Sequence, residues 1–292
     1  MNTLLKLILT MILVFVTSVL LTPVLKILLP MFLFEKIFNR LIMILTVVTA
    51  FFFLRKQKIS WQSFGFDFSG PWKRLASYGF IFGIGLVLSM VALEVILGPR
   101  YVRDSMNFSD MIQRFAKGMA SGIAVGIVEE FFFRGFIYRW LAVRMNAATA
   151  VALSSAFYSL AHFLDNGQIF IPKHPGIKDA IRLLFGYLEP LFFHTGTVLP
   201  EFFGLFLFGV LLSVAYLRTQ SLFLSIGIHA GCVLVIKWQH SFFRVGSDAF
   251  HVLYGRPPLY DGPVEWVFLV VGTFLILLFV RPSKKLLVDV CK

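Results

Sequence analysis

Three charged residues, Glu129, Glu130 and Arg134, lie close together in a stretch from Ile123 to Tyr138 that is otherwise strongly apolar. On hydropathy this stretch belongs in a bilayer, where one charged side chain near the centre of a helix costs about 2.5–3.5 kcal/mol. Ionisable groups at that depth are presumed to be functional. Carboxylates can accept protons from water, so the stretch predicts a buried site capable of hydrolysis.

The two carboxylates are predicted to play different parts. Residues four apart stack on one face of an α-helix, so Glu130 and Arg134 are expected to form an ion pair. Glu129 lies about 100° around the helix, and no basic residue stands one turn away on that helix. A carboxylate without a fixed counter-charge in a low-dielectric site is a better proton acceptor, which favours Glu129 as a general base. The alternatives are a carboxylate bound by nearby hydroxyls and one in a transport path.

Two histidines on later apolar segments, His162 and His229, are the other candidate site residues. Each belongs to a polar stripe with a spacing of three or four residues. The stripes are Ser155, Tyr158, Ser159 and His162 in the first segment, and Ser225, His229 and Cys232 in the second. A polar stripe on an apolar helix is expected to face protein or water, so the two stripes and Glu129 could enclose one polar cavity.

The composition of the chain predicts the kind of helices that must position these residues. The chain has 292 residues, of which 58% are hydrophobic, and a mean hydropathy of +0.84. Soluble domains are about 45–50% apolar, and a membrane span needs about 20 largely apolar residues. We therefore predict an all-α, polytopic transmembrane bundle in a single domain, 1–292, with short amphipathic pieces within 165–197. Its eight predicted spans are 7–27, 38–54, 76–98, 116–142, 146–164, 198–217, 221–240 and 263–280.

The glycines before the charged residues predict how the fourth segment packs. Gly118, Gly122 and Gly126 stand in the same row as Glu130 and Arg134. Small residues at this spacing let a second helix approach closely in a bilayer. The row therefore predicts a close-packed seam that continues into the ion pair.

The net charge of +12 indicates basic loops that meet anionic lipid, and not nucleic acid. The basic cluster at Arg55, Lys56 and Lys58 and the basic residues after the last segment favour cytoplasmic termini. The short basic loops suggest a bacterial inner membrane. The two cysteines, Cys232 and Cys291, give little basis for a disulfide, and the first segment is predicted to be an uncleaved helix.

The motifs resemble those of the CAAX protease and bacteriocin-processing (CPBP, or ABI) family over 115–240. They are Glu129-Glu130-x-x-x-Arg134, Tyr158-x-x-x-His162 and His229-Ala-Gly-Cys-Val233. In the family the corresponding patterns are Glu-Glu-x-x-x-Arg, Phe-x-x-x-His and His-x-x-x-Asn or Asp, each on a transmembrane helix. The resemblance implies a type II CAAX prenyl endopeptidase-like protein.

The resemblance also implies a role for each matched residue. Glu129 would activate water, His162 would help to hold it, and His229 would stabilise the oxyanion. Glu130, Arg134 and Tyr158 would support them. Val233 departs from the pattern, because its isopropyl group cannot donate a hydrogen bond. Ser225, Cys232 or a backbone amide could substitute for the missing donor.

Three functions follow from these expectations. The first is an intramembrane endopeptidase that cleaves a peptide or lipidated protein arriving from the bilayer, and it needs no cofactor. In a zinc variant, Glu129, His162 and His229 would hold the metal, although the chain has no His-Glu-x-x-His motif. The second is a non-catalytic immunity or scaffold protein, which Val233 favours. The third is a proton-coupled transporter. The sequence does not show the repeated halves that are common in such proteins.

Overall fold

The computed structural model describes residues 3–56, 61–98, 100–162, 169–193, 195–246, 251–254 and 261–283. These residues are almost entirely helical, and each of the eight predicted apolar segments coincides with a helix or a continuous helical stretch. The predicted all-α fold is therefore confirmed. The structure also contains a short two-stranded antiparallel sheet, which the sequence pattern did not predict.

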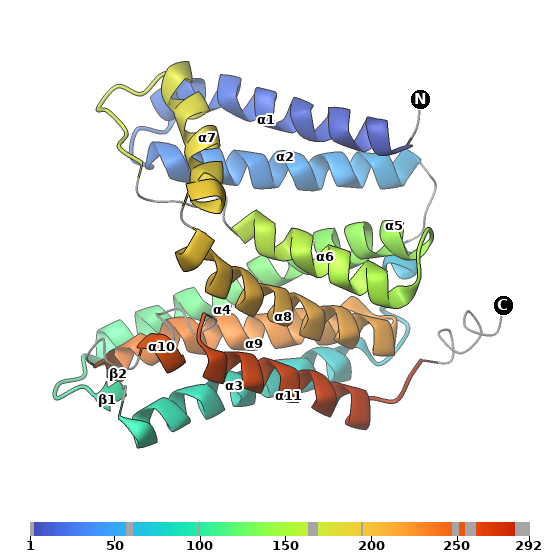
Figure 1. The fold of residues 1–292 in the computed structure, drawn as a ribbon, viewed down its shortest axis with the longest axis vertical. Coiled ribbons are helices and arrows are strands. Elements are labelled where there is room, and N and C mark those ends of the chain that lie inside the picture. The colour runs from blue at the N-terminus through green and yellow to red at the C-terminus, as the bar shows by residue number, and fades with distance from the viewer. Residues whose placement is uncertain are drawn as a thin grey trace. The chain divides into compact units, whose positions relative to one another are not determined.

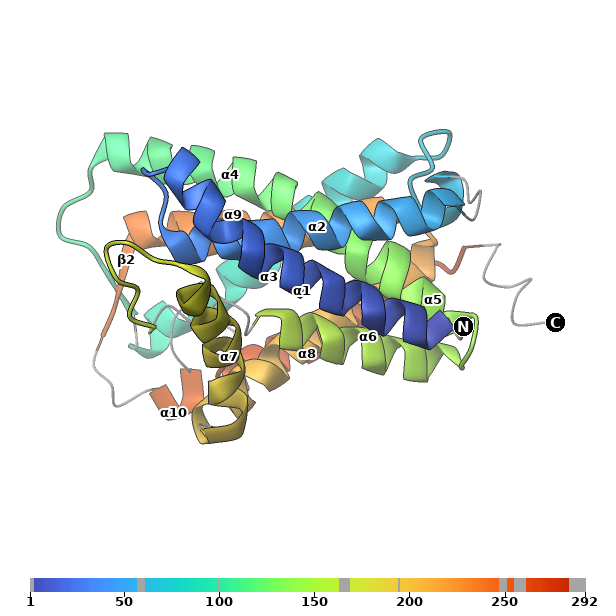
Figure 2. The ribbon, with the colours of Figure 1, turned by 90° about the horizontal axis from the view of Figure 1, so that it is seen from above.

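The chain divides into two compact units. The first unit contains Met1–Ile59 and Leu160–Val198. Helices α1 (Thr3–Leu28) and α2 (Phe34–Lys56) lie side by side in it, and α7 (Ile177–Phe193) packs across both (Figures 1 and 2). Tyr187 of α7 donates a hydrogen bond to Asn39 of α2 at 2.6 Å, which ties these helices together. Helix α7 is the amphipathic piece expected within 165–197.

The second unit, Ser60–Ser159 and Leu199–Lys292, carries the remaining elements. The last residues of helix α6 and the first residues of helix α8 belong to the first unit. The elements in chain order are η1 (Trp61–Phe64), α3 (Trp72–Leu97), β1 (Arg100–Val102), α4 (Phe108–Glu130), η2 (Phe131–Tyr138), α5 (Arg139–Ala142), α6 (Ala147–His162), α8 (Thr195–Thr219), α9 (Leu222–Trp238), η3 (Gln239–Ser241), β2 (Phe243–Val245), α10 (His251–Tyr254) and α11 (Pro263–Phe279).

Within the part of the chain that the structure describes, four helical stretches are long and apolar enough to cross a membrane. They are Leu9–Leu28, Trp72–Leu97, Val198–Thr219 and Leu222–Ser241. These spans indicate an integral membrane protein, as predicted. The last of them is 78% buried inside the protein, compared with 22–50% for the others, so α9 is the internal helix of its unit.

Glycines allow α9 to pack closely against α3 on one side and α4 on the other (Figure 1). A methyl group at Gly83 of α3 would overlap the carbonyl oxygen of Ile228, and one at Gly227 of α9 would overlap that of Ala76. On the α4 side, a methyl group at Gly122 would lie 2.7 Å from the carbonyl oxygen of Ala230. The predicted seam of α4 is thus confirmed, and its partner is the helix that carries His229.

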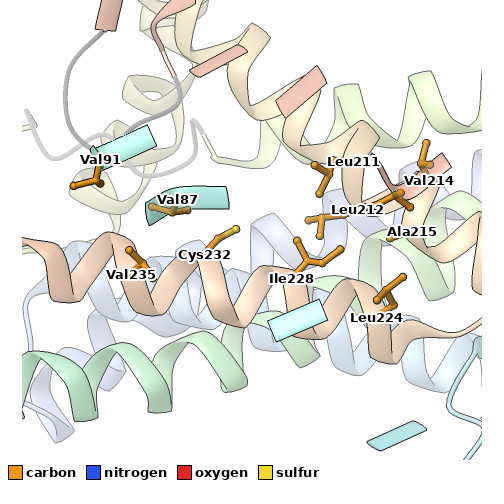
Figure 3. Close-up of a cluster of buried hydrophobic side chains, with 11 residues drawn as sticks. Val87, Val91, Leu211, Leu212, Val214, Ala215, Leu224, Ile228, Cys232 and Val235 are labelled. Carbon is orange, nitrogen blue, oxygen red and sulfur yellow. The ribbon is translucent and has the colours of Figure 1, made fainter. Parts of the chain in front are cut away.

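An apolar cluster joins α3, α8, α9 and α11 (Figure 3). Its members include Val87, Leu211, Leu212, Ile228 and Cys232, each at most 3% exposed. The C-terminal end of α11 is held by α8, since Arg218 donates to the carbonyls of Leu277 and Val280. This arrangement anchors α8 and α9, which both contribute to the candidate site.

Candidate active site

The charged segment begins on an α-helix and continues as a π-helix. Asn107 caps the start of α4 by accepting from the backbone of Ser109 and Asp110. After Glu130 the backbone becomes π-helical over Phe131–Tyr138, and the helix continues without interruption. Such π-helical turns are rare and occur often at functional sites. The sequence pattern predicted a regular α-helix here, because apolar periodicity cannot distinguish a short π-helical segment from an α-helical one.

The predicted ion pair between Glu130 and Arg134 is confirmed. Nη1 of Arg134 lies 2.8 Å from Oε1 of Glu130, and these side chains are 1% and 0% exposed. Nη2 of Arg134 donates to the carbonyl of Gly209 on α8 at 3.0 Å, and the guanidinium lies 4.7 Å from the ring centroid of Tyr158. A buried charge pair is stable only when its other polar atoms also find partners, which these neighbours partly supply.

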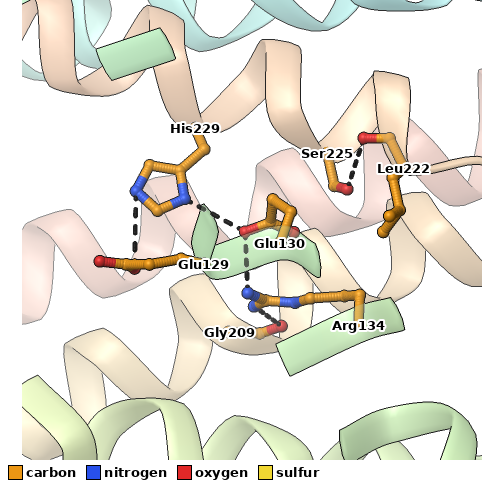
Figure 4. Close-up of polar contacts among 7 residues, drawn as sticks. All are labelled: Glu129, Glu130, Arg134, Gly209, Leu222, Ser225 and His229. Carbon is orange, nitrogen blue, oxygen red and sulfur yellow. Dashed lines mark hydrogen bonds and ion pairs between the residues drawn. The ribbon is translucent and has the colours of Figure 1, made fainter. Parts of the chain in front are cut away.

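His229 lies between the two glutamates (Figure 4). Its Nδ1 is 3.1 Å from Oε1 of Glu130, and its Nε2 is 3.9 Å from Oε2 of Glu129. The Glu129 side chain is 19% exposed, whereas those of Glu130 and His229 are 0% and 4% exposed. Glu129 is therefore the more accessible of the two carboxylates.

The contact with Glu130 sets the hydrogen-bonding direction of the imidazole. An ion-paired carboxylate can only accept, so Nδ1 of His229 is assigned as the donor. Nε2 then faces Glu129 across a gap that exceeds a direct hydrogen bond. Two polar atoms at this distance can be bridged by one water molecule that hydrogen-bonds to both.

Aromatic rings hold the opposite side of His229. The ring of Phe208 meets the imidazole edge-on at 5.5 Å between centroids, and that of Tyr158 does so at 6.4 Å. Phe208 and Gly209, both on α8, were missed by sequence reasoning. Nothing in their types or spacing separates them from the other apolar residues of a membrane helix.

Two predicted supporting residues, Ser225 and Cys232, make contacts with helix carbonyls, and their role in the site stays a prediction. The hydroxyl of Ser225 donates to the carbonyl of Leu222 on its own helix at 3.0 Å (Figure 4). Sγ of Cys232 lies 3.6 Å from the carbonyl of Gly83, within the apolar cluster against α3. The stripe did not indicate that α9 is packed by both α3 and α4.

His162 is the last residue of α6, is half-buried, and belongs to the first unit. Its participation in the site remains a prediction. Val233, four residues after His229 on α9, is also half-buried. Among the described residues, no group of three or more His, Cys, Asp and Glu side chains could hold a metal ion.

Comparison with known proteins bears on this geometry. Residues 112–235 match the family model described as type II CAAX prenyl endopeptidase Rce1-like. The chain carries an Rce1-like domain of this CPBP family. The matched range contains the six motif residues Glu129, Glu130, Arg134, Tyr158, His162 and His229. Searches of curated proteins and of solved structures returned no match.

An Rce1-like domain implies intramembrane proteolysis, and so a peptide substrate. The domain extends from α4 to α9 and includes the seam that joins these helices. The residues that approach one another in space therefore belong to the same family domain.

Proposed function

We propose that the Rce1-like domain is an intramembrane endopeptidase in which Glu129 activates a water molecule. The observation that carries this proposal is the position of His229, with Nδ1 on Glu130 and Nε2 turned towards Glu129. A general base must reach its proton directly or through one water. Glu129 is accessible enough to meet water and close enough to His229 to act on the same peptide bond.

In the proposed reaction, the water oxygen attacks the scissile carbonyl carbon and Glu129 takes the proton that the water loses. The carbonyl π electrons move onto oxygen, where N–H of His229 at Nε2 stabilises the negative charge. For this step His229 carries protons on both nitrogens, between two carboxylates. The oxyanion then re-forms the carbonyl double bond as the carbon–nitrogen bond breaks, and Glu129 passes its proton to the departing amine nitrogen. The new carboxylic acid loses its remaining hydroxyl proton to solvent and becomes a carboxylate.

Glu130 and Arg134 support the reaction by holding His229. Glu130 accepts from Nδ1, while Arg134 neutralises Glu130 and binds α8 through Gly209. Because His229 is also enclosed by Tyr158 and Phe208, its ring has little freedom to turn. A preorganised donor stabilises developing charge without reorganising during the reaction. His162 is proposed to help hold the water.

The proposed substrate is a peptide segment of a membrane-associated protein, prenylated or leader-type, that reaches the site from the bilayer. The family description names CAAX prenyl endopeptidases, which supports a lipidated C-terminal substrate. No cofactor is required in this mechanism. In the zinc variant, Glu129, His162 and His229 would be the metal ligands.

The test uses the full chain in detergent with matched prenylated and unprenylated peptides. Cleavage should be lost in Glu129→Ala and unaffected by a chelator. Asp110→Asn, on the same helix but paired with Arg114, is the matched control. Undiminished cleavage in Glu129→Ala would exclude this base, and chelator inhibition that zinc reverses would select the metal route.

One observation favours a second, non-catalytic function. Val233 offers no hydrogen-bond donor at the position where the family pattern has Asn or Asp. An immunity or scaffold protein could keep the fold and bind a peptide without cleaving it. Saturable peptide binding with no product, in the wild type and in Glu129→Ala alike, would support this alternative.

A further inference from the structure

Four buried polar atoms belong to the ion pair and to the two helices, α6 and α8, that contact Arg134. They are Oε2 of Glu130, Nε of Arg134 and the hydroxyls of Ser155 and Ser213. Each residue is at most 1% exposed, and none of these atoms has a hydrogen-bond partner among the described residues. Buried polar groups in native proteins are normally bonded to protein or ordered water.

Arg134 and α6 both approach α8 at Gly209. Nη2 of Arg134 donates to the Gly209 carbonyl at 3.0 Å. On α6, the Ser155 hydroxyl would lie 3.2 Å from a methyl group placed at Gly209. Ser213 follows one helical turn later, where its backbone N–H is the regular helix partner of the same carbonyl. Because residues 209 and 213 share one face of α8, the guanidinium, Ser155 and Ser213 all lie within one helical turn of Gly209.

The chemistry of these atoms indicates what they bind. Glu130 contributes an acceptor, Arg134 a donor, and each serine hydroxyl can do both. The ion pair is already balanced in charge, so neither an anion nor a cation is needed. A small neutral molecule with both donors and acceptors matches this set, and water is bound in proteins by two to four such partners.

We propose that this cluster is a site for internal water, in which Ser155 and Ser213 are positioning residues for Glu130. Water bound to both hydroxyls and to Oε2 restrains the Glu130 carboxylate, and with it the Nδ1 hydrogen bond of His229. The hydration itself stands on the geometry alone. Its effect on cleavage rests on the proposed function.

The test compares Ser155→Ala and Ser213→Ala with Ser154→Ala in the full chain in detergent. Ser154 is an apt control because it is 1% exposed and its hydroxyl donates to Val151 of its own helix. In a hydrated cluster, removal of either hydroxyl breaks a water contact, so the unfolding temperature should fall further than in the control. In a dry cluster, removal of an unsatisfied hydroxyl should leave the unfolding temperature unchanged or raise it, which would overturn the proposal.

Kinetics separate the two proposals. With positioning residues, kcat should fall several-fold in both variants at unchanged KM, and Ser213→Thr, which keeps the hydroxyl, should retain more activity than Ser213→Ala. If the serine variants unfold at a lower temperature but the wild type cleaves no peptide, the water site stands and the protease proposal fails. An active wild type whose serine variants keep both stability and kcat would do the reverse.

Discussion

Glu130 and His229, 99 positions apart in the chain, meet at 3.1 Å in a fully buried contact. The same carboxylate oxygen accepts from Arg134 at 2.8 Å. One oxygen thus links a guanidinium on the π-helical turn to an imidazole on the internal helix. Because each partner is buried, a change at either one should affect both stability and the site.

The ion pair predicts a non-additive double-mutant cycle. Arg134→Met leaves Glu130 buried without its counter-charge, which should cost about 3–5 kcal/mol of unfolding free energy. Glu130→Gln combined with Arg134→Met removes both charges and should recover much of that loss. Denaturant unfolding in detergent micelles measures the cycle. A double variant as unstable as the sum of the single variants would show that the two residues do not interact energetically.

The glycine seam predicts opposite effects for two glycines of α3. Gly83→Ala should destabilise the protein, since its methyl group would overlap the backbone of α9, while nothing lies within 4 Å of a methyl group at Gly85. Gly85→Ala should be neutral or stabilising by about 0.5–1 kcal/mol, because alanine favours the helix. Thermal unfolding of both variants tests this prediction. Equal effects would mean that close helix approach does not limit position 83.

Val233 predicts a gain of function. An asparagine there would place an amide donor one turn from His229, and one oxyanion donor contributes about 10²–10³-fold in kcat. Val233→Asn should therefore raise kcat for peptide cleavage, and Val233→Leu, which adds no donor, should not. Steady-state kinetics provide the measurement. If Asn and Leu variants behave alike, this side chain does not reach the oxyanion.

Arg100 on β1 predicts a pH dependence outside the membrane spans. It is buried, pairs with Glu94 of α3, and donates to Gln239 at 2.9 Å. Burial lowers the pKa of Arg100 to about 10, while nearby Glu265 opposes the change. The ordinary arginine pKa is about 12.5–13.8, so above about pH 10 the unfolded chain binds more protons at this residue. Its contribution to stability is constant below that pH and should increase with pH above it.

The measurement is the difference in unfolding free energy between wild type and Arg100→Met, followed from pH 8 to about pH 11. The difference should be flat at first and then shift in favour of the wild type as pH rises through about 10. Since titration of other groups affects both proteins, it largely cancels in the comparison. A difference that favours Arg100→Met increasingly above that pH would reverse the assigned sign.

Local spacing alone was enough to predict much of this protein. Each of the eight predicted apolar segments is helical, although only four helical stretches of the described residues are long and apolar enough to span a membrane. The row from Gly118 to Arg134 predicted both the α4 seam and the buried pair. These predictions succeed because residues three or four apart on a helix are neighbours whatever surrounds them. The family motifs likewise depend only on order and spacing, and the match over residues 112–235 confirms an Rce1-like domain.

Contacts between helices were decided only by the tertiary structure. Spacing could not show that His229 would meet Glu130, that Phe208 and Gly209 of α8 would complete the surroundings, or that Cys232 would face α3. On a helix packed by protein on opposite faces, polar and apolar positions do not identify which neighbour each side chain meets. That choice depends on where glycines let backbones approach, which requires both partner helices at once.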